Sequence, residues 1–238
     1  MLKDKDPMGA AIADYYKNGV AGRLRVFSPD FDEDEIPVAT LFRGFDEMPV
    51  IEQTALRMAS GHTLDVGAGA GCHSIALQEM GKDVTAIDIS PLSVQTMRNR
   101  GVKHCMEQDF WTLNGCYDTI LMLMNGIGIV GTLARMDEFF SHVGSLLAPD
   151  GQLIVDSTDI SYLFEDEDGN LTGFPNGEYY GQLQYQMQYK RIKGTPFPWL
   201  YIDSGTLSDI ASRNGFDVEV VGQGEHYDFL ARITRSKG

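Results

Sequence analysis

The chain has 238 residues and a formal net charge of −15 at pH 7, from 34 acidic and 19 basic residues. This length suits one large α/β domain with a small cap. Nucleic-acid backbones are bound through stripes of lysine and arginine, so such an acidic chain is not expected to have a nucleic-acid partner. The one basic cluster, residues 190–193, is expected to be a solvated strand end.

Cysteine usage and hydropathy indicate the compartment. Cys72, Cys105 and Cys116 show neither disulfide-framework nor metal-ligand spacing. The first seven residues contain no apolar signal core, and no run approaches the length of a membrane span. We therefore expect a cytoplasmic protein without a membrane partner and without a bound metal.

Residues 1–55 are expected to form an N-terminal helical cap. A disordered leader would carry few aromatic residues, because each of these can bury a large apolar area. Those of this segment include Tyr15, Tyr16 and Phe42. Residues 49–59 read as a helix that begins at a proline, with Gly61 just past its end. This helix should lead the chain into the first core strand.

A glycine-rich stretch follows that strand. Residues 63–66 form a short apolar run, Gly67, Gly69 and Gly71 follow on alternate positions, and residues 74–80 carry apolar side chains at helical spacing. A strand therefore ends, turns tightly and becomes a helix. Glycine suits such a turn because the backbone adopts angles that a side chain disfavours, and because a ligand can lie directly against the main chain. The stretch predicts the floor of a cofactor site.

The details of this stretch distinguish between cofactors. Dinucleotide enzymes use the spacing G-x-G-x-x-G, whereas this chain has G-x-G-x-G with Asp65 two residues ahead of the first glycine. The next predicted strand, residues 84–88, ends in a second acid, Asp88. This combination resembles the first motifs of the class I, Rossmann-like S-adenosylmethionine-dependent methyltransferases. In that family the acid at the position of Asp88 holds the ribose, since a carboxylate can accept from both hydroxyls of a cis-diol.

The resemblance continues along the middle half of the chain, through residues 108–110, 117–125 and a turn at 147–151 that leads into a fifth strand. Such an ordered series is more specific than one glycine loop. It implies S-adenosylmethionine as the cofactor. The cofactor-binding residues that it implies are Asp65, Gly67, Ala68, Gly69, Gly71, Asp88, Ile89, Gln108, Asp109, Phe110 and Asn125. Arg43 of the cap is expected either to pair with the cofactor carboxylate or to form an ion pair within the protein.

The remaining pattern completes an α/β fold. The pattern predicts a helix over 90–101, a strand of weak signal over 102–106 and a strand of strong apolar signal over 118–124. An amphipathic helix over 133–147 and a strand over 152–157 follow. Residues 180–189 then alternate between polar and other side chains, as in an antiparallel strand, and 198–202 can pair with them. A short helix is expected over 207–214, followed by a terminal pair of strands over 218–221 and 227–234.

We therefore predict a seven-stranded, mostly parallel, doubly wound sheet with antiparallel C-terminal strands and an inserted hairpin. The expected domains are the cap (1–55), the cofactor-binding core (56–160) and a C-terminal part (161–238) that contains the hairpin and the final strands.

Methyl transfer from a sulfonium needs mainly positioning and desolvation, with a base only where the acceptor arrives protonated. Candidates for such roles are Asn125, Asp156 and Asp159, because they lie at the carboxyl ends of the fourth and fifth strands, where ligands of open parallel sheets bind. The segment after Asn125 lacks the proline and aromatic residue of the N-P-P-Y motif, so nucleic-acid specificity is not implied. His62, His73 and His104 show no partner pattern and are expected to be structural.

The expected acceptor is a small molecule such as an amine, a phenol or a carboxylate. Trp199 and Tyr201 are expected to meet the cap aromatics over the methyl group and wall the acceptor pocket, unless they only fill the space beneath the hairpin. Two other classes remain possible: a non-catalytic cofactor-binding or scaffold protein of this fold, and a nucleotide-binding oxidoreductase, which the glycine spacing opposes. The sequence leaves the oligomeric state open.

Overall fold

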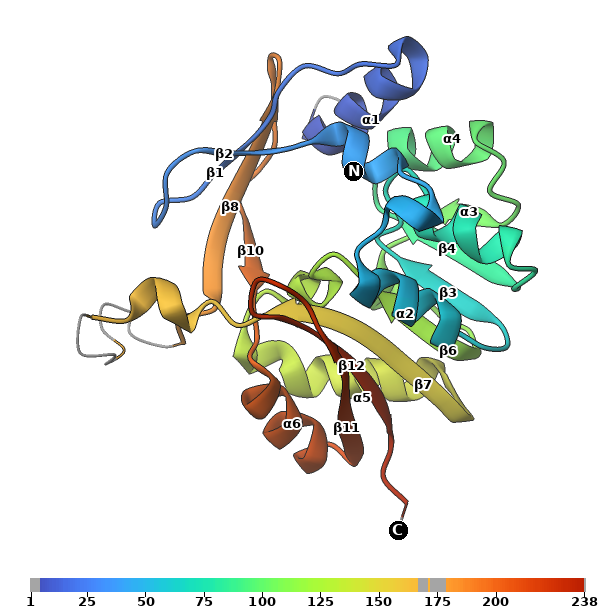
Figure 1. The fold of residues 1–238 in the computed structure, drawn as a ribbon, viewed down its shortest axis with the longest axis vertical. Coiled ribbons are helices and arrows are strands. Elements are labelled where there is room, and N and C mark those ends of the chain that lie inside the picture. The colour runs from blue at the N-terminus through green and yellow to red at the C-terminus, as the bar shows by residue number, and fades with distance from the viewer. Residues whose placement is uncertain (1–4, 167–170, 172–178, 238) are drawn as a thin grey trace.

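The computed structural model describes residues 5–166, 171 and 179–237, which form a layered α/β core and a second, smaller sheet (Figure 1). The helices are α1 (Pro7–Asn18), α2 (Val50–Met58), α3 (Cys72–Glu79), α4 (Pro91–Asn99), α5 (Met136–Leu146) and α6 (Ser204–Arg213). Short 3-10 helices are η2 (Val38–Phe42), η3 (Phe45–Glu47), η4 (Phe110–Thr112), η5 (Gly126–Val130), η6 (Leu133–Arg135) and η7 (Ser161–Phe164). Among the residues described, no helix has the length and apolar character of a membrane span.

The larger sheet has seven strands in the order β11-β12-β7-β6-β3-β4-β5. Its strands are β3 (Thr63–Val66), β4 (Val84–Asp88), β5 (Cys105–Glu107), β6 (Tyr117–Met122), β7 (Leu147–Thr158), β11 (Phe216–Gln223) and β12 (Asp228–Arg235). Strands β3 to β7 pair in parallel, whereas β12 runs antiparallel to both β7 and β11. The predicted sheet is confirmed. The expected turn at 147–151 lies instead within β7, where the pairing with β6 changes register.

Helices cover both faces of this sheet because successive residues of its central strands point to opposite sides. Ile120 of β6 packs in the core that contains α5 and α6, whereas the next residue, Leu121, packs in the core that contains α2 and α3. Both side chains are fully buried. Two apolar layers therefore hold the sheet from either side, which explains the continuous apolar runs of the strands.

The second sheet is antiparallel and has the order β10-β8-β1-β2, with β9 paired to β8. Its strands are β1 (Leu24–Phe27), β2 (Asp34–Ile36), β8 (Gln182–Tyr189), β9 (Ile192–Lys193) and β10 (Phe197–Leu200). The predicted hairpin is present, but residues 1–55 are not a purely helical cap, since β1 and β2 are strands that pair with this hairpin. Strands of three or four residues are unstable alone, so their pairing depends on a distant segment.

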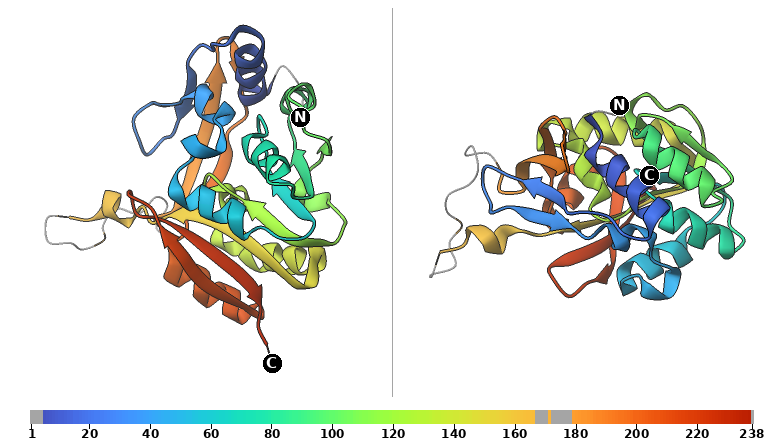
Figure 2. Two further views of the ribbon diagram at one scale, coloured as in Figure 1. Left: turned by 45° about the vertical axis from the view of Figure 1, so that its right-hand side comes forward. Right: turned by 90° about the horizontal axis from the view of Figure 1, so that it is seen from above.

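Together with α1, this sheet forms a unit that we call the roof (α1, β1, β2, β8, β9 and β10), which stands beside the layered core (Figure 2). At one end its residues Leu24 and Tyr189 pack with Ala11 of α1. At the other end Leu183 packs with Ile160, which follows β7. The roof therefore extends over the edge of the large sheet at which the parallel strands end.

Helix α1 is joined to the core through two linked N-caps. The Asp6 carboxylate accepts a hydrogen bond from Gly9 N–H at the start of α1 (2.8 Å) and another from the Ser90 hydroxyl (2.5 Å). Ser90 in turn caps α4 by accepting from Ser93 N–H (3.0 Å), as the Ser-Pro sequence predicts. A Cβ at Gly9 would lie 2.2 Å from the Ser90 hydroxyl oxygen, so only glycine allows this approach.

Asp6→Ala should lower the free energy of unfolding by about 1–2 kcal/mol, because the variant loses the cap of α1 and removes the partner of the buried Ser90 hydroxyl. Urea denaturation followed by circular dichroism measures this change. Asp6→Asn keeps one acceptor oxygen, so its free energy of unfolding should fall by less. Equal stability of the wild type and the alanine variant would contradict the linked caps.

Candidate active site

The glycine loop connects β3 to α3 at the carboxyl edge of the large sheet. Its three glycines all have positive φ, namely 69° at Gly67, 56° at Gly69 and 82° at Gly71. The amides of Gly67 and Ala68 both donate to the carbonyl of Ile87 in the neighbouring strand β4 (2.9 and 3.0 Å). The loop is therefore a fixed left-handed turn, as its sequence predicts.

The first and last glycines of this loop have different surroundings. A Cβ added to Gly67 would meet no atom within 4 Å, whereas one added to Gly71 would lie 2.9 Å from Val102 and 3.0 Å from Met97. Gly71 is therefore required for packing against the end of α4. Gly67 faces open space, where a cofactor can lie against the backbone.

Asp88 ends strand β4 beside this loop. One of its carboxylate oxygens accepts from Gly69 N–H (2.9 Å) and the other from Ser90 N–H (2.7 Å). Burial raises the pKa of Asp88 to about 6, although both backbone donors oppose this shift. Each oxygen can accept a second hydrogen bond, so the group suits a ribose diol. Ile89, next in sequence, exposes 46% of its surface and offers an apolar face at the same edge.

Asp65 lies beneath the loop rather than on its surface. Its carboxylate is 2% exposed and accepts from the Ser74 hydroxyl of α3 (2.6 Å), and burial raises its pKa. The structure therefore places Asp65 as a support that joins β3 to α3.

The three residues expected near the adenine differ in exposure. Asp109 is exposed and caps η4 by accepting from Trp111 N–H (3.0 Å). The half-buried Gln108 side chain donates to the Thr112 hydroxyl (2.9 Å). Phe110 is only 3% exposed and packs in the main core. Of the three, Phe110 is therefore the one that the structure places inside the protein, because it supplies the apolar contact between η4 and α5.

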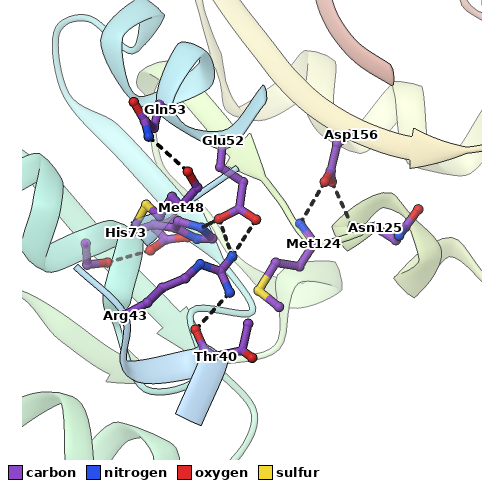
Figure 3. A network of polar contacts seen from close by, with 11 residues as sticks. Thr40, Arg43, Met48, Glu52, Gln53, His73, Met124, Asn125 and Asp156 are labelled. Carbon is purple, nitrogen blue, oxygen red and sulfur yellow. Dashed lines mark hydrogen bonds and ion pairs between the residues drawn. The ribbon is translucent and has the colours of Figure 1, made fainter. Parts of the chain in front are cut away.

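A buried network joins the N-terminal segment to the core (Figure 3). The Arg43 guanidinium donates to both carboxylate oxygens of Glu52 in α2, and His73 of α3 lies 2.7 Å from one of them. Burial opposes ionisation of Glu52, but His73 and Arg43 outweigh it and hold the Glu52 pKa below its usual value. Arg43 therefore forms an ion pair within the protein. Its Nε–H has no hydrogen-bond partner within the described part of the chain.

The sequence reading did not identify Glu52 as part of this site. Its signal is the helical stripe of Glu52, Ala55, Leu56 and Ala59, which places one acid on an otherwise apolar, inward side of α2. Arg100 was also missed: it donates to the carbonyl of Ala70 in the glycine loop (2.6 Å). No local pattern marks it, because its acceptor is a backbone group distant in sequence.

The candidates at the carboxyl ends of strands β6 and β7 fall into two groups. Met124 and Asn125 donate their backbone N–H groups to the carboxylate of Asp156 (3.1 and 2.8 Å; Figure 3). The Thr158 hydroxyl donates to Asn125 Oδ1 (3.1 Å). Asn125 and Asp156 are thus brought together, with Asp156 supporting the backbone.

Asp159 belongs to a different cluster. It accepts from Ser161 N–H (2.9 Å) and from the Tyr180 hydroxyl (2.9 Å), whereas Asp203 accepts from Tyr179 (2.6 Å). No group of three or more metal-ligating side chains occurs in the ranges that the structure describes.

The expected acceptor wall is present in part. Trp199 of β10 packs so closely on η5 that a Cβ at Gly128 would lie 2.2 Å from its indole ring. The Tyr15 and Phe42 rings lie 4.5 Å apart in a tilted arrangement, and Tyr16 donates to a carbonyl of α4. Among the described residues no ring pair joins these two aromatic groups directly, and Tyr15 and Phe42 pack with Leu24 and Tyr189 at the β1 end of the roof.

A glycine loop with a following acid at the carboxyl edge of a doubly wound sheet defines a Rossmann-like cofactor-binding protein. Residues 44–221 match the family model described as a methyltransferase domain. A structure of an S-adenosylmethionine-dependent methyltransferase from Bacteroides fragilis, in complex with S-adenosyl-L-homocysteine, is 55% identical, with a TM-score of 0.94 and coverage of 100% of this chain and 98% of that one. The chain belongs to this methyltransferase family, and it is a class I S-adenosylmethionine-dependent enzyme.

Two further methyltransferases are similar to this chain at lower identity. Demethylmenaquinone methyltransferase of Tropheryma whipplei (strain Twist) is 32% identical over 105 residues, which are 41% of this chain and 41% of that protein. The CcbJ methyltransferase from Streptomyces caelestis is 13% identical, with a TM-score of 0.62 over 99% of this chain and 100% of that one, and shares the fold. The oxidoreductase and non-catalytic alternatives are therefore set aside.

Gly67→Ala and Gly71→Ala form a matched pair that separates ligand contact from packing. Both replacements carry a similar backbone cost of about 1–2 kcal/mol, because both positions have positive φ. Gly67→Ala should also weaken S-adenosylhomocysteine binding by about tenfold or more in calorimetry, whereas Gly71→Ala should mainly lower the melting temperature. If both variants lose stability and affinity to the same extent, the cofactor does not lie against Gly67.

Asp88→Ala should weaken S-adenosylhomocysteine binding by about 1–3 kcal/mol, since two ribose hydroxyls lose their acceptor. Protonation of Asp88 should also weaken binding, because a neutral carboxyl offers fewer acceptor sites for the ribose hydroxyls. Wild-type affinity should therefore fall as the pH decreases below about 6, the raised pKa of Asp88. Calorimetry across this range tests the assignment, and an alanine variant with wild-type affinity would refute it.

Proposed function

We propose that the protein transfers the methyl group of S-adenosylmethionine to a small-molecule acceptor held between the carboxyl edge of the large sheet and the roof. The observation that carries this proposal is the position of β10, whose Trp199 lies on η5 directly after the loop that follows β6. Ligands of such sheets bind where these strands end. The roof supplies the second wall that a pocket for a small acceptor needs.

The side of the roof that packs against α1 is largely apolar. Register places the same-side residues of β8, β1 and β10 together, and those that remain partly exposed are Val26, Tyr185, Met187, Phe197 and Trp199. Bound S-adenosylmethionine supplies an electrophilic methyl group on a sulfonium. Apolar walls exclude water where this positive charge is lost, which favours transfer to the acceptor.

Charge on the roof bears on the class of acceptor. Arg25 and Lys193 lie on the opposite side of the sheet, where Arg25 pairs with Glu33 and Lys193 lies over the ring of Phe27. Among the described roof strands, the charged position on the α1 side is Asp34, opposite Val26. The cation nearest to this side, Lys190 just after β8, is paired with Asp14 of α1, so an anionic acceptor would have to compete with that carboxylate. We therefore favour an amine or a phenol over a carboxylate. The same reasoning, with the acidic chain as a whole, argues against nucleic acid.

An acceptor panel of amines, phenols and carboxylates, with detection of S-adenosylhomocysteine release, tests this proposal. We expect turnover with amines or phenols. Trp199→Leu should reduce kcat/KM for the acceptor found by about tenfold or more, while leaving S-adenosylhomocysteine affinity nearly unchanged. Turnover confined to carboxylates would overturn the acceptor class. Equal loss of stability and cofactor affinity, with unchanged turnover per folded molecule, would show that Trp199 is only core.

A further inference from the structure

Two adjacent residues after β6 adopt an unusual backbone conformation. Met124 has φ of 60° and Asn125 has φ of 55°, and both are non-glycine residues. Left-handed conformations are uncommon outside glycine; asparagine tolerates them, whereas methionine has no such preference. Strained residues of this kind persist only where the surrounding structure holds them, and they concentrate at functional sites.

A single side chain holds both residues. The two carboxylate oxygens of Asp156 accept one backbone N–H each, Oδ2 from Met124 and Oδ1 from Asn125. The Thr158 hydroxyl fixes the Asn125 side chain from the same strand. Asp156 is 5% exposed and pairs through its backbone with Leu230 of β12, so it is enclosed in the sheet. Figure 3 shows the carboxylate directed at the loop.

We propose that Asp156 is a positioning residue, not a base, which holds the Met124–Asn125 loop in its left-handed form and so shapes the wall between the cofactor and acceptor positions. The strand β6 that ends in this loop is the neighbour of β3, which carries the glycine loop. The loop continues into η5, on which Trp199 rests. The acceptor side of this role rests on the proposed function, whereas the clamp itself does not.

The geometry explains why Asp156 does not serve as a base. Both of its oxygens are occupied by backbone donors of its own chain, and its burial leaves little access for an acceptor proton. Burial raises the pKa of Asp156 to about 7, with a further rise from Glu52 of α2 and opposing effects from Asn125, His73 of α3 and Met124. Protonation would remove an acceptor, so the clamp should weaken as the pH falls through neutrality.

The amide protons of Met124 and Asn125 report the clamp without any acceptor. In ¹⁵N-labelled wild-type protein these two resonances should titrate together near pH 7. Asp156→Asn should abolish this titration and shift both resonances, because an amide offers one oxygen and turns its NH₂ group toward the second N–H. Asp118→Asn is the matched control: this carboxylate accepts from His62 N–H at the opposite end of β6, and its loss should leave both resonances unchanged.

Rescue separates positioning from proton transfer. Met124→Gly makes the left-handed conformation accessible without a clamp at the residue that tolerates it least, so it should recover part of what Asp156→Asn loses. Asp156→Asn should weaken S-adenosylhomocysteine binding by about threefold or more and reduce kcat for an identified acceptor by about 10- to 100-fold. The double variant should lie closer to the wild type in both S-adenosylhomocysteine affinity and kcat. Unshifted Met124 and Asn125 resonances in Asp156→Asn, or a double variant as impaired as the sum of its single changes, would overturn the proposal. Failure to find an acceptor would affect only the proposed function.

Discussion

The Asp88 carboxylate links the cofactor loop to the elements around it, because it accepts hydrogen bonds from backbone N–H groups in turns that lie outside the regular ladders of hydrogen bonds. It fixes Gly69 from one oxygen and Ser90 from the other. The Ser90 hydroxyl then bonds to Asp6, which caps α1. One chain of hydrogen bonds therefore joins the cofactor loop, the start of α4 and the helix above the loop. A Cβ at Gly69 would lie 3.8 Å from Ile12 of α1, so the same helix also covers the loop.

A second carboxylate has the corresponding role on the other side of the loop. Glu52 joins Arg43 of the N-terminal segment to His73 at the start of α3, and all three side chains are less than one tenth exposed. Removing one partner of such a buried set leaves a charge without compensation, so each of the three depends on the other two. The Nε–H of Arg43 is buried in this set and has no hydrogen-bond partner among the described residues. The glycine loop therefore lies between two hydrogen-bonded networks, one at Asp88 and one at Glu52, and apolar packing forms the layers around it.

Much of the fold was predictable because its signals are local. Apolar periodicity located the strands and helices of the large sheet, and the alternation over 180–189 located the central strand of the roof. The N-terminal strands were missed because three or four residues carry too little periodicity to be recognised, and because their partner β8 lies far along the chain. The packing of Phe110 shows the same limit, because its contacts in the core that contains α5 are set by residues distant in sequence.

The sequence by itself determined the left-handed glycine turn, the acid that follows the next strand, and hence the cofactor class, since these depend on backbone angles and spacing within one βαβ unit. Only the tertiary structure decided which charges meet. Arg43 pairs with Glu52 rather than remaining free, Asp156 accepts hydrogen bonds from a backbone loop, and the roof is built from two distant segments. Such contacts depend on which elements pack together, and the order of side chains along one element does not encode that arrangement.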